Sequence, residues 1–146
     1  MRGGSENYSV TPELFSRFAY RLLGMLKDSG RVYDGIICPL RGGFFLSYFM
    51  SIHLKLPVNY MEISSYADKN RKEFTIKNLP ELTAGYYLIC DDIYDSGNTI
   101  KKIISLYPGI KFDAACLVSK KENPPGVFYA KKVSEDVWVD FFWEVM

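Results

Sequence analysis

The chain gathers three acidic residues in a ten-residue segment, Cys90–Thr99. Asp91 and Asp92 follow directly on the apolar run Tyr86–Cys90, and Asp95 lies three residues further on. Carboxylates of this kind accept hydrogen bonds from neighbouring hydroxyl groups and bind hard cations such as Mg²⁺. The segment therefore predicts a site for a polyol ligand, with a divalent cation beside it.

A predicted phosphate-binding turn comes next. Ser96-Gly97-Asn98-Thr99 places hydroxyl and amide side chains around a glycine, immediately before a predicted helix over residues 100–107. Such a turn directs backbone N–H groups inward, and the helix N-terminus adds partial positive charge, so that one phosphate can bind. The segment has neither the Walker lysine nor the spaced glycines of a dinucleotide site, which favours a ribose 5-phosphate. An acidic surface turn is the simpler alternative, but it explains only Asp92 and Ser96, as caps.

A second loop with similar properties follows a predicted buried strand over Gly35–Pro39. The loop Leu40-Arg41-Gly42-Gly43 lets backbone N–H groups approach a ligand and carries a guanidinium suited to bidentate phosphate binding. We interpret it as a second anion site. An ordinary glycine turn with a solvated arginine is the alternative, and the presence of the first motif makes it the weaker one.

The segment Cys90–Thr99 resembles the phosphoribosyl diphosphate signature of the type I phosphoribosyltransferases. The resemblance implies that Asp91 and Asp92 hold ribose hydroxyls and a Mg²⁺ cofactor, with Asp92 favoured over Asp91 as the metal contact. It implies that Asp95 accepts a proton from the purine or stabilises charge on it. The residues implied to hold the 5-phosphate are Ser96, Gly97, Asn98 and Thr99.

The same resemblance assigns the diphosphate to the loop containing Arg41 and Gly42. In this family the loop often contains a cis peptide, which here would join Leu40 to Arg41. Arg41 and a second cation would neutralise the leaving diphosphate. The protein then needs to form no covalent bond, because its tasks are to hold the two reactants in line and to exclude water.

A strand is predicted over residues 58–64, and the polar stretch Ser65–Glu73 is predicted to be a mobile loop because it shows no hydrophobic periodicity. The family resemblance implies a lid over the substrate, with Ser64, Ser65 and Tyr66 at its root. Lys72 or Arg71 would then reach the diphosphate. The predicted catalytic residues are Asp95, Arg41 and Lys72. A merely solvated loop is the alternative.

Three further features are similar to bacterial xanthine, guanine and hypoxanthine phosphoribosyltransferases: Ile63-Ser64-Ser65-Tyr66, Lys120, and the Trp138-Val139 pair before Phe142-Trp143-Glu144. An ammonium donates hydrogen bonds and cannot accept them, so Lys120 suits the 6-oxo group of a purine. The resemblance places Trp138 against the base and the main chain of Val139 at its Watson–Crick edge. Lys120 and Lys121 as a solvated strand end is the alternative.

The resemblance implies a purine salvage enzyme that transfers 5-phosphoribosyl from phosphoribosyl diphosphate to a 6-oxopurine and releases diphosphate. Two other functions stay open. One is the same reaction with another base, and the other is a non-catalytic regulator that senses phosphoribosyl diphosphate or nucleotides.

The elements that position these residues predict an α/β domain. A first helix is expected with Thr11 as N-cap and Pro12 at its first position, and a second over Phe44–Leu54. With the strands, they indicate strand–loop–helix units, and the family resemblance implies the type I phosphoribosyltransferase fold, a mainly parallel twisted sheet flanked by helices. A single domain is expected over residues 6–146, with a small hood made by the N-terminal helix region and residues 120–146. Residues 1–5 are expected to be a floppy terminus or a cloning remnant.

Composition and net charge limit the classes of partner that the protein is expected to bind. The 146 residues have a formal net charge of +1, which does not favour nucleic acid or an anionic membrane as a partner. The chain has no apolar run of membrane-spanning length and no signal-peptide pattern, so a cytoplasmic protein is expected. The three cysteines are expected to be buried thiols. The apolar helix predicted over Phe44–Met50 suggests a homodimer or homotetramer.

Overall fold

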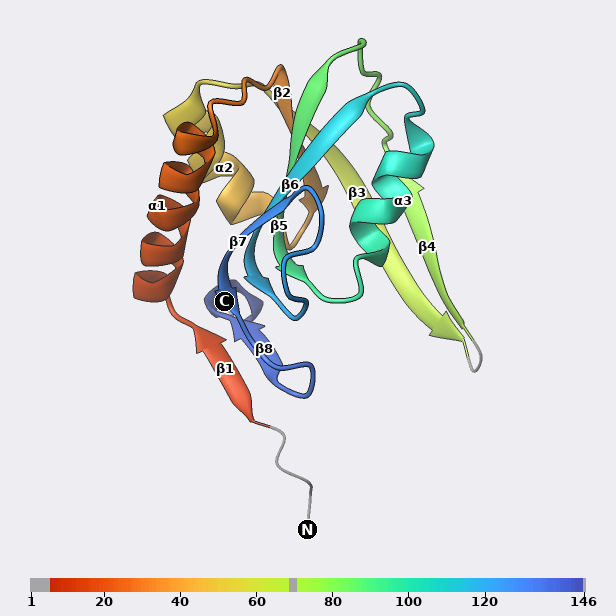
Figure 1. Cartoon of the computed structure of the whole chain (residues 1–146). Helices are drawn as coiled ribbons and strands as arrows, with labels where there is room; N and C mark the ends of the chain where they lie inside the picture. Colours follow the sequence, from red (N-terminus) through yellow and green to blue (C-terminus); the bar gives the residue numbers. More distant parts are fainter. Residues whose placement is uncertain (1–5, 69–70, 146) are drawn as a thin grey trace.

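The computed structural model describes residues 6–68 and 71–145, with the backbone alone for residues 65–68 and 71–74. The chain forms a single twisted sheet with helices on both faces and a small two-stranded sheet near its termini (Figure 1). In chain order the elements are β1 (Asn7–Val10), α1 (Pro12–Ser29), β2 (Gly35–Leu40), α2 (Phe44–Leu54), β3 (Val58–Asp68), β4 (Arg71–Lys77), β5 (Tyr86–Tyr94), α3 (Asn98–Leu106), β6 (Lys111–Ser119), β7 (Val127–Lys132), β8 (Trp138–Phe141) and the 3-10 turn η1 (Phe142–Val145).

The main sheet has six strands in the order β4-β3-β2-β5-β6-β7. β3 and β4 pair antiparallel, whereas the other neighbours pair parallel. The chain moves outward from β2 to β3 on one side and from β5 to β6 on the other, so the strand order reverses between β2 and β5. Ligands of open α/β sheets bind at such a reversal, outside the carboxyl ends of the strands. This confirms the predicted α/β class with a mainly parallel sheet.

Two hydrophobic cores lie on opposite faces of this sheet. On one face Leu22 of α1 and Met50 of α2 pack with Leu88 of β5, and on the other Ile103 of α3 packs with Ile89. These side chains are fully buried. Burying each of these side chains stabilises the fold by roughly 1.5–3 kcal/mol. Because the central strands are covered on both faces, their sequences are nearly continuous apolar runs.

The first helix begins as its sequence predicts. The Thr11 hydroxyl accepts a hydrogen bond from the Leu14 N–H at 3.1 Å, and Pro12 opens the helix. Gly30 ends it in the left-handed conformation at φ 69°. The helix is therefore anchored at both ends, and it covers β6 and β7 (Figure 1).

The small sheet pairs β1 with β8 in parallel, from Asn7 against Trp138 to Val10 against Phe141. It corresponds to part of the predicted hood. β7, which lies within residues 120–146, pairs with β6 in the main sheet. Parallel neighbours usually need a connection of a dozen or more residues, whereas residues 120–126 make this one, so the sequence does not indicate the pairing.

The sequence predicts a mobile loop over Ser65–Glu73, but the described residues of this stretch form strands. β3 continues to Asp68 and pairs antiparallel with β4, with Ala67 opposite Lys72. Figure 1 shows the two strands projecting together from the body of the sheet. Cross-strand backbone hydrogen bonds hold such a ribbon whatever its polarity, so hydrophobic periodicity does not reveal it.

The three cysteines, Cys38, Cys90 and Cys116, are buried and unpaired, as expected. Within residues 6–68 and 71–145, no helix has the length and apolar character needed to cross a membrane.

Candidate active site

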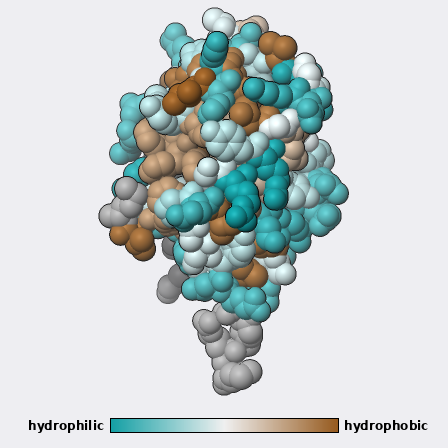
Figure 2. Space-filling model, turned by 90° about the vertical axis from the view of Figure 1, so that its left-hand side faces the viewer, coloured by the Kyte–Doolittle hydropathy of each residue, from teal (hydrophilic) through white to brown (hydrophobic). Residues whose placement is uncertain are grey.

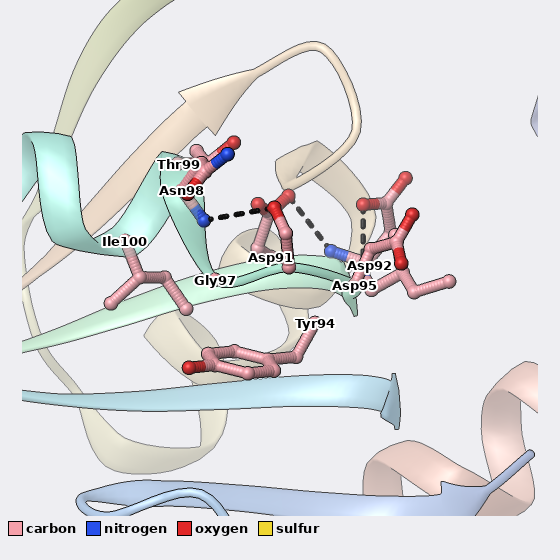
Figure 3. A pocket seen from close by; sticks show the side chains of 10 residues that line it. Asp91, Asp92, Tyr94, Asp95, Gly97, Asn98, Thr99 and Ile100 are labelled. Atoms are coloured by element: carbon pink, nitrogen blue, oxygen red, sulfur yellow. Dashed lines mark hydrogen bonds between the residues drawn. The ribbon is translucent and has the colours of Figure 1, made fainter. Parts of the chain in front are cut away.

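The acid pair lies at the carboxyl end of β5, at the reversal of strand order. Asp91 is only 8% exposed and Asp92 is half-buried. The Asp92 N–H donates to Asp91 Oδ1 at 2.9 Å, and the Ile93 N–H donates to Asp92 Oδ1 at 2.8 Å (Figure 3). These bonds fix both carboxylates and use one oxygen of each. The second oxygen can therefore meet a ligand or a cation.

Burial makes two adjacent charges costly. It raises the pKa of Asp91 well above its ordinary value, and repulsion from Asp92 adds to this effect. Burial also raises the pKa of Asp92, while hydrogen bonds from backbone N–H groups oppose the rise. A bound cation or a set of hydroxyl donors would relieve this cost, so the pair is suited to a ligand that supplies positive charge or hydrogen-bond donors.

The phosphate turn follows at the start of α3. Gly97 is the N-cap residue at φ 85°, and no side chain caps this end of the helix. Its conformation favours glycine, and a Cβ there would collide with the Tyr94 hydroxyl. The Asn98 N–H donates weakly to the Ser96 hydroxyl at 3.3 Å. The helix N-terminus is thus free to receive an anion.

A cavity of about 220 Å³ lies within this turn (Figure 3). Its walls include the predicted residues Asp91, Asp92, Asp95, Ser96, Gly97, Asn98 and Thr99. Asp95 and Ser96 are exposed, so a ligand can reach them from solvent. The structure therefore brings together every residue that the sequence predicts for the ribose and its phosphate.

The second loop lies against the acid pair. The peptide bond between Leu40 and Arg41 is cis, as the family resemblance implies. A Cβ on Gly42 would lie 2.5 Å from Oδ2 of Asp92, so a side chain at this position would displace either the loop or the carboxylate. A cavity of about 250 Å³ joins the two sites, with walls from Arg41, Gly42, Asp91, Asp92 and Thr99.

A larger cavity opens on the other side of Arg41. Its volume is about 880 Å³, and its walls are Leu40, Arg41, Gly42, Phe44, Phe45, Asp92, Trp143 and Glu144. Sequence reasoning did not assign the last two to the site. Nothing in the spacing of the tail distinguishes Glu144 from a surface acid, because the fold alone brings it opposite Asp92.

A third cavity, of about 530 Å³, lies between Arg41 and the paired strands β3 and β4. Ser64 forms part of its wall, with Glu62 and Lys77 beside it. The side chains of Ser65, Tyr66, Arg71 and Lys72 lie outside the described residues. Their backbones belong to β3 and β4, next to this cavity.

The residues predicted for the base lie apart from these cavities. None of the four cavities described above includes Lys120, Trp138 or Val139 in its wall. Lys120 follows β6, where its N–H donates to the Tyr94 carbonyl at 2.9 Å and its ammonium to the Glu135 carbonyl at 3.3 Å. Trp138 is 65% exposed, whereas Val139 is buried in the core.

The acid pair fits a magnesium ion that also binds the substrate. Among the described residues there is no cluster of three or more acidic, histidine or cysteine side chains that could hold a metal alone. Mg²⁺ commonly takes one or two carboxylates and completes its shell with phosphate oxygens and water. Asp91 and Asp92 supply that number.

Comparison with known proteins agrees with this arrangement. The model of the phosphoribosyl transferase domain matches residues 17–146. The chain is similar to the xanthine-guanine-hypoxanthine phosphoribosyltransferase of Helicobacter pylori, with 28% identity, a TM-score of 0.80, and coverage of 96% of this chain and 95% of that one. A purine phosphoribosyltransferase from Pyrococcus horikoshii is 23% identical with a TM-score of 0.77, covering 94% and 93%. A Neisseria gonorrhoeae protein with bound ppGpp is 20% identical with a TM-score of 0.75, covering 98% and 92%.

The family match covers most of the chain, and the acid pair, the phosphate turn and the glycine loop all lie within it. The chain therefore belongs to the phosphoribosyltransferase family.

Proposed function

We propose that this protein transfers the 5-phosphoribosyl group from phosphoribosyl diphosphate to a 6-oxopurine and releases diphosphate, as a step of purine salvage. The observation that carries the proposal is the cavity shared by Arg41, Gly42, Asp91, Asp92 and Thr99. This cavity supports the proposal because the Arg41 loop, the acid pair and the start of the phosphate turn all contribute to its wall. The similarity to the Helicobacter pylori enzyme supports the choice of base.

In the proposed reaction, the bond between the anomeric carbon and the diphosphate oxygen breaks and a bond to a purine nitrogen forms. Positive charge spreads over the sugar ring in the transition state. Ser96–Thr99 and the N-terminus of α3 anchor the 5-phosphate, and Arg41 neutralises the leaving diphosphate, with Lys72 as a second cation. Asp95, exposed at the rim of the turn, accepts the proton of the purine or stabilises its charge.

The proposed metal site is the acid pair, with Asp92 as the nearer contact. Mg²⁺ bound there would offset the charge of the diphosphate. Asp91 and Asp92 would also accept hydrogen bonds from the ribose hydroxyls, which orients the sugar for in-line displacement.

The proposed base site lies between Lys120 and β8. The Lys120 ammonium can turn from the Glu135 carbonyl, where its 3.3 Å hydrogen bond is long, toward a 6-oxo group. The exposed Trp138 ring offers a flat surface for stacking, and the backbone of Val139 is adjacent. An adenine amino group would instead meet a like donor.

The experiment that tests this proposal is nucleotide formation from phosphoribosyl diphosphate and Mg²⁺ with hypoxanthine, guanine, xanthine, adenine, uracil and orotate in parallel. Turnover confined to the first three supports it. Turnover with adenine or a pyrimidine alone would show that the reaction is right and the base wrong.

A sensing function is the second candidate, because one protein of this fold is known with bound ppGpp. No turnover with any base, combined with tight binding of phosphoribosyl diphosphate or a guanine nucleotide, would favour it. Arg41, Asp95 and Asp91 are all at the site in this chain, which favours catalysis.

We also propose a cytoplasmic homodimer or homotetramer. α2 contains no Asp, Glu, Lys or Arg, and its residues Phe44, Tyr48 and Ile52 are 40%, 57% and 54% exposed. They follow one another at four-residue intervals and so lie on one stripe of the helix. Figure 2 views the molecule from the side of α1 and α2 and shows apolar side chains open to solvent there. Sedimentation of the wild type and of Tyr48→Glu would test whether this stripe is covered by a second copy.

A further inference from the structure

Trp143 joins the C-terminal turn of the chain to the glycine loop. Its ring stacks on Phe141 of β8, with centroids 4.8 Å apart and an interplanar angle of 12°. On its other side it stacks on Phe45 in the first turn of α2, at 4.9 Å and 18°. Phe15 of α1 meets it edge-on at 6.0 Å. Trp143 is thus fixed by three elements that are far apart in the sequence.

The contact with Phe45 leads directly to the loop that carries Arg41. The Phe44 N–H donates to the Arg41 carbonyl at 3.1 Å, and the Gly43 N–H donates to the Pro39 carbonyl at 2.9 Å. The loop is therefore hydrogen-bonded to the same helical turn on which Trp143 stacks. A shift of Phe45 would move the N-terminus of α2, and with it the backbone of Arg41.

The carboxylate that follows Trp143 is held by β8, on which Trp143 stacks. The Phe141 N–H donates to Glu144 Oε1 at 2.7 Å, so the turn η1 closes back on β8. This leaves Glu144 in the wall of the large cavity, together with Arg41 and Asp92. Although burial is the main cause of the raised pKa of Asp92, the charge of Glu144 contributes to it.

We infer that Trp143 is a positioning residue for the diphosphate end of the site: it sets the Arg41 loop through Phe45 and sets Glu144 through η1. This inference rests on the proposed function for the identity of the ligand. It assigns Trp143 to the binding of phosphoribosyl diphosphate and not to the binding of the base, although Trp143 lies in the same tail as the residues proposed for the base.

The kinetic test uses Trp143→Leu and Trp143→Phe, with the KM for each substrate measured separately. Trp143→Leu is expected to raise the KM for phosphoribosyl diphosphate at least about tenfold and to leave the KM for the base within about twofold. Trp143→Phe keeps an aromatic ring and is expected to restore most of the loss. If Trp143→Leu does not fold, a rise of about threefold for Trp143→Phe is the expected result, and an unchanged KM would overturn the inference.

The matched control is Phe112→Leu. Phe112 is a half-buried aromatic residue near the start of β6, away from the carboxyl ends, and it packs with Tyr87 and Tyr107. Its loss should lower the melting temperature in the same way and leave both KM values unchanged. An equal rise of both KM values in Trp143→Leu would mean that Trp143 serves stability alone.

A binding readout separates this inference from the proposed function. Trp138 and Trp143 are the two tryptophans of the chain, so Trp138→Phe leaves Trp143 as the reporter. Inorganic diphosphate with Mg²⁺ is expected to change its fluorescence, and Phe45→Leu, which removes the ring between Trp143 and the Arg41 loop, is expected to weaken that binding. If diphosphate changes the Trp143 fluorescence but the wild-type protein turns over no base, the proposed function is overturned and the inference about Trp143 stands. If the wild-type protein turns over a base but diphosphate leaves the Trp143 fluorescence unchanged, the inference is overturned and the proposed function stands.

Discussion

Gly42 and Asp92 touch so closely that a Cβ atom on Gly42 would lie 2.5 Å from Oδ2 of Asp92. Gly42 lies in the loop after β2 and Asp92 lies in β5, and the two belong to the two predicted anion sites. Their contact makes the glycine loop Leu40–Gly43 and the acid pair one structural unit. Five predictions concern this unit, its neighbours and the framework that supports it.

Gly42→Ala should displace the loop or rotate Asp92. We expect a loss of about 1–3 kcal/mol of stability from overpacking and a rise of tenfold or more in the KM for phosphoribosyl diphosphate. Steady-state kinetics and thermal unfolding measure both. Gly24→Ala is the matched control, because Gly24 lies in α1 with nothing within 4 Å of the added Cβ, and it should add about 0.5–1 kcal/mol with normal activity.

Asp91→Asn should stabilise the protein without ligand. The pKa of Asp91 is raised in the folded state, so ionisation at neutral pH opposes folding: stability is present below the unfolded pKa and is lost as the pH rises through the folded one. Removing the charge should raise the melting temperature at pH 7 by roughly 2–4 °C for each kcal/mol recovered. The same change should weaken binding of phosphoribosyl diphosphate with Mg²⁺ in calorimetry. A lower melting temperature would show that the charge is already compensated in the free protein.

Asp95→Asn should lower kcat by about 10² or more, the usual scale for loss of a general acid or base. Asp95 is exposed on the phosphate turn, so the fold should not change. The KM for phosphoribosyl diphosphate should change much less than kcat. Unchanged kcat would remove Asp95 from the mechanism.

Lys120→Gln should reduce kcat/KM for hypoxanthine by about 10- to 100-fold, the value of a hydrogen bond from a charged donor. Lys121→Gln is the control, because Lys121 forms an exposed ion pair with Glu135 at 3.0 Å and should change kcat/KM by less than about twofold. Equal effects of the two substitutions would refute the assignment of the 6-oxo group to Lys120.

Asp113 supports the opposite end of the sheet. Burial acts to raise its pKa, but hydrogen bonds from Tyr33 at 2.6 Å, from Tyr86 and from Arg31 at 2.8 Å outweigh this and hold the pKa below its ordinary value of 3.8. A lowered pKa contributes stability above the unfolded pKa that is lost as the pH falls through the folded one. Asp113→Asn should therefore cost about 1–3 kcal/mol at pH 7 and flatten the loss of stability below pH 4. Denaturant unfolding across this range tests it, and an unchanged acid profile would contradict it.

The two ligand loops could be predicted because their chemistry is local. Asp91, Asp92 and the turn at Gly97 are adjacent in the sequence, and each follows a strand that its apolar run makes evident. Because β2 and β5 are parallel neighbours, their carboxyl ends lie side by side, and the two loops that follow them meet at one edge of the sheet.

The contribution of the tail to this edge could not be predicted in the same way. Trp143 and Glu144 reach the cavity only because β8 pairs with β1 and sets the path of η1. That pairing joins two short strands at opposite ends of the chain, and neither strand carries a sequence signal for its partner. The sequence also did not predict that β7 pairs with β6 or that β3 pairs with β4. The reason is the same, because backbone hydrogen bonds between strands depend little on side-chain type.

The pairing of β1 with β8 also has a consequence for folding. Residues 7–10 pair with residues 138–141, so the two strands are separated by most of the given sequence. β1 can therefore form its backbone hydrogen bonds only after β8 is in place. Contacts of this kind form late, because loop closure must be completed before they contribute energy. The phosphate turn is built from neighbouring residues and can form before Trp143 and Glu144 reach the Arg41 loop. Completion of the cavity at the Arg41 loop would then coincide with a late step of folding, so local formation of the phosphate turn alone does not give the whole site.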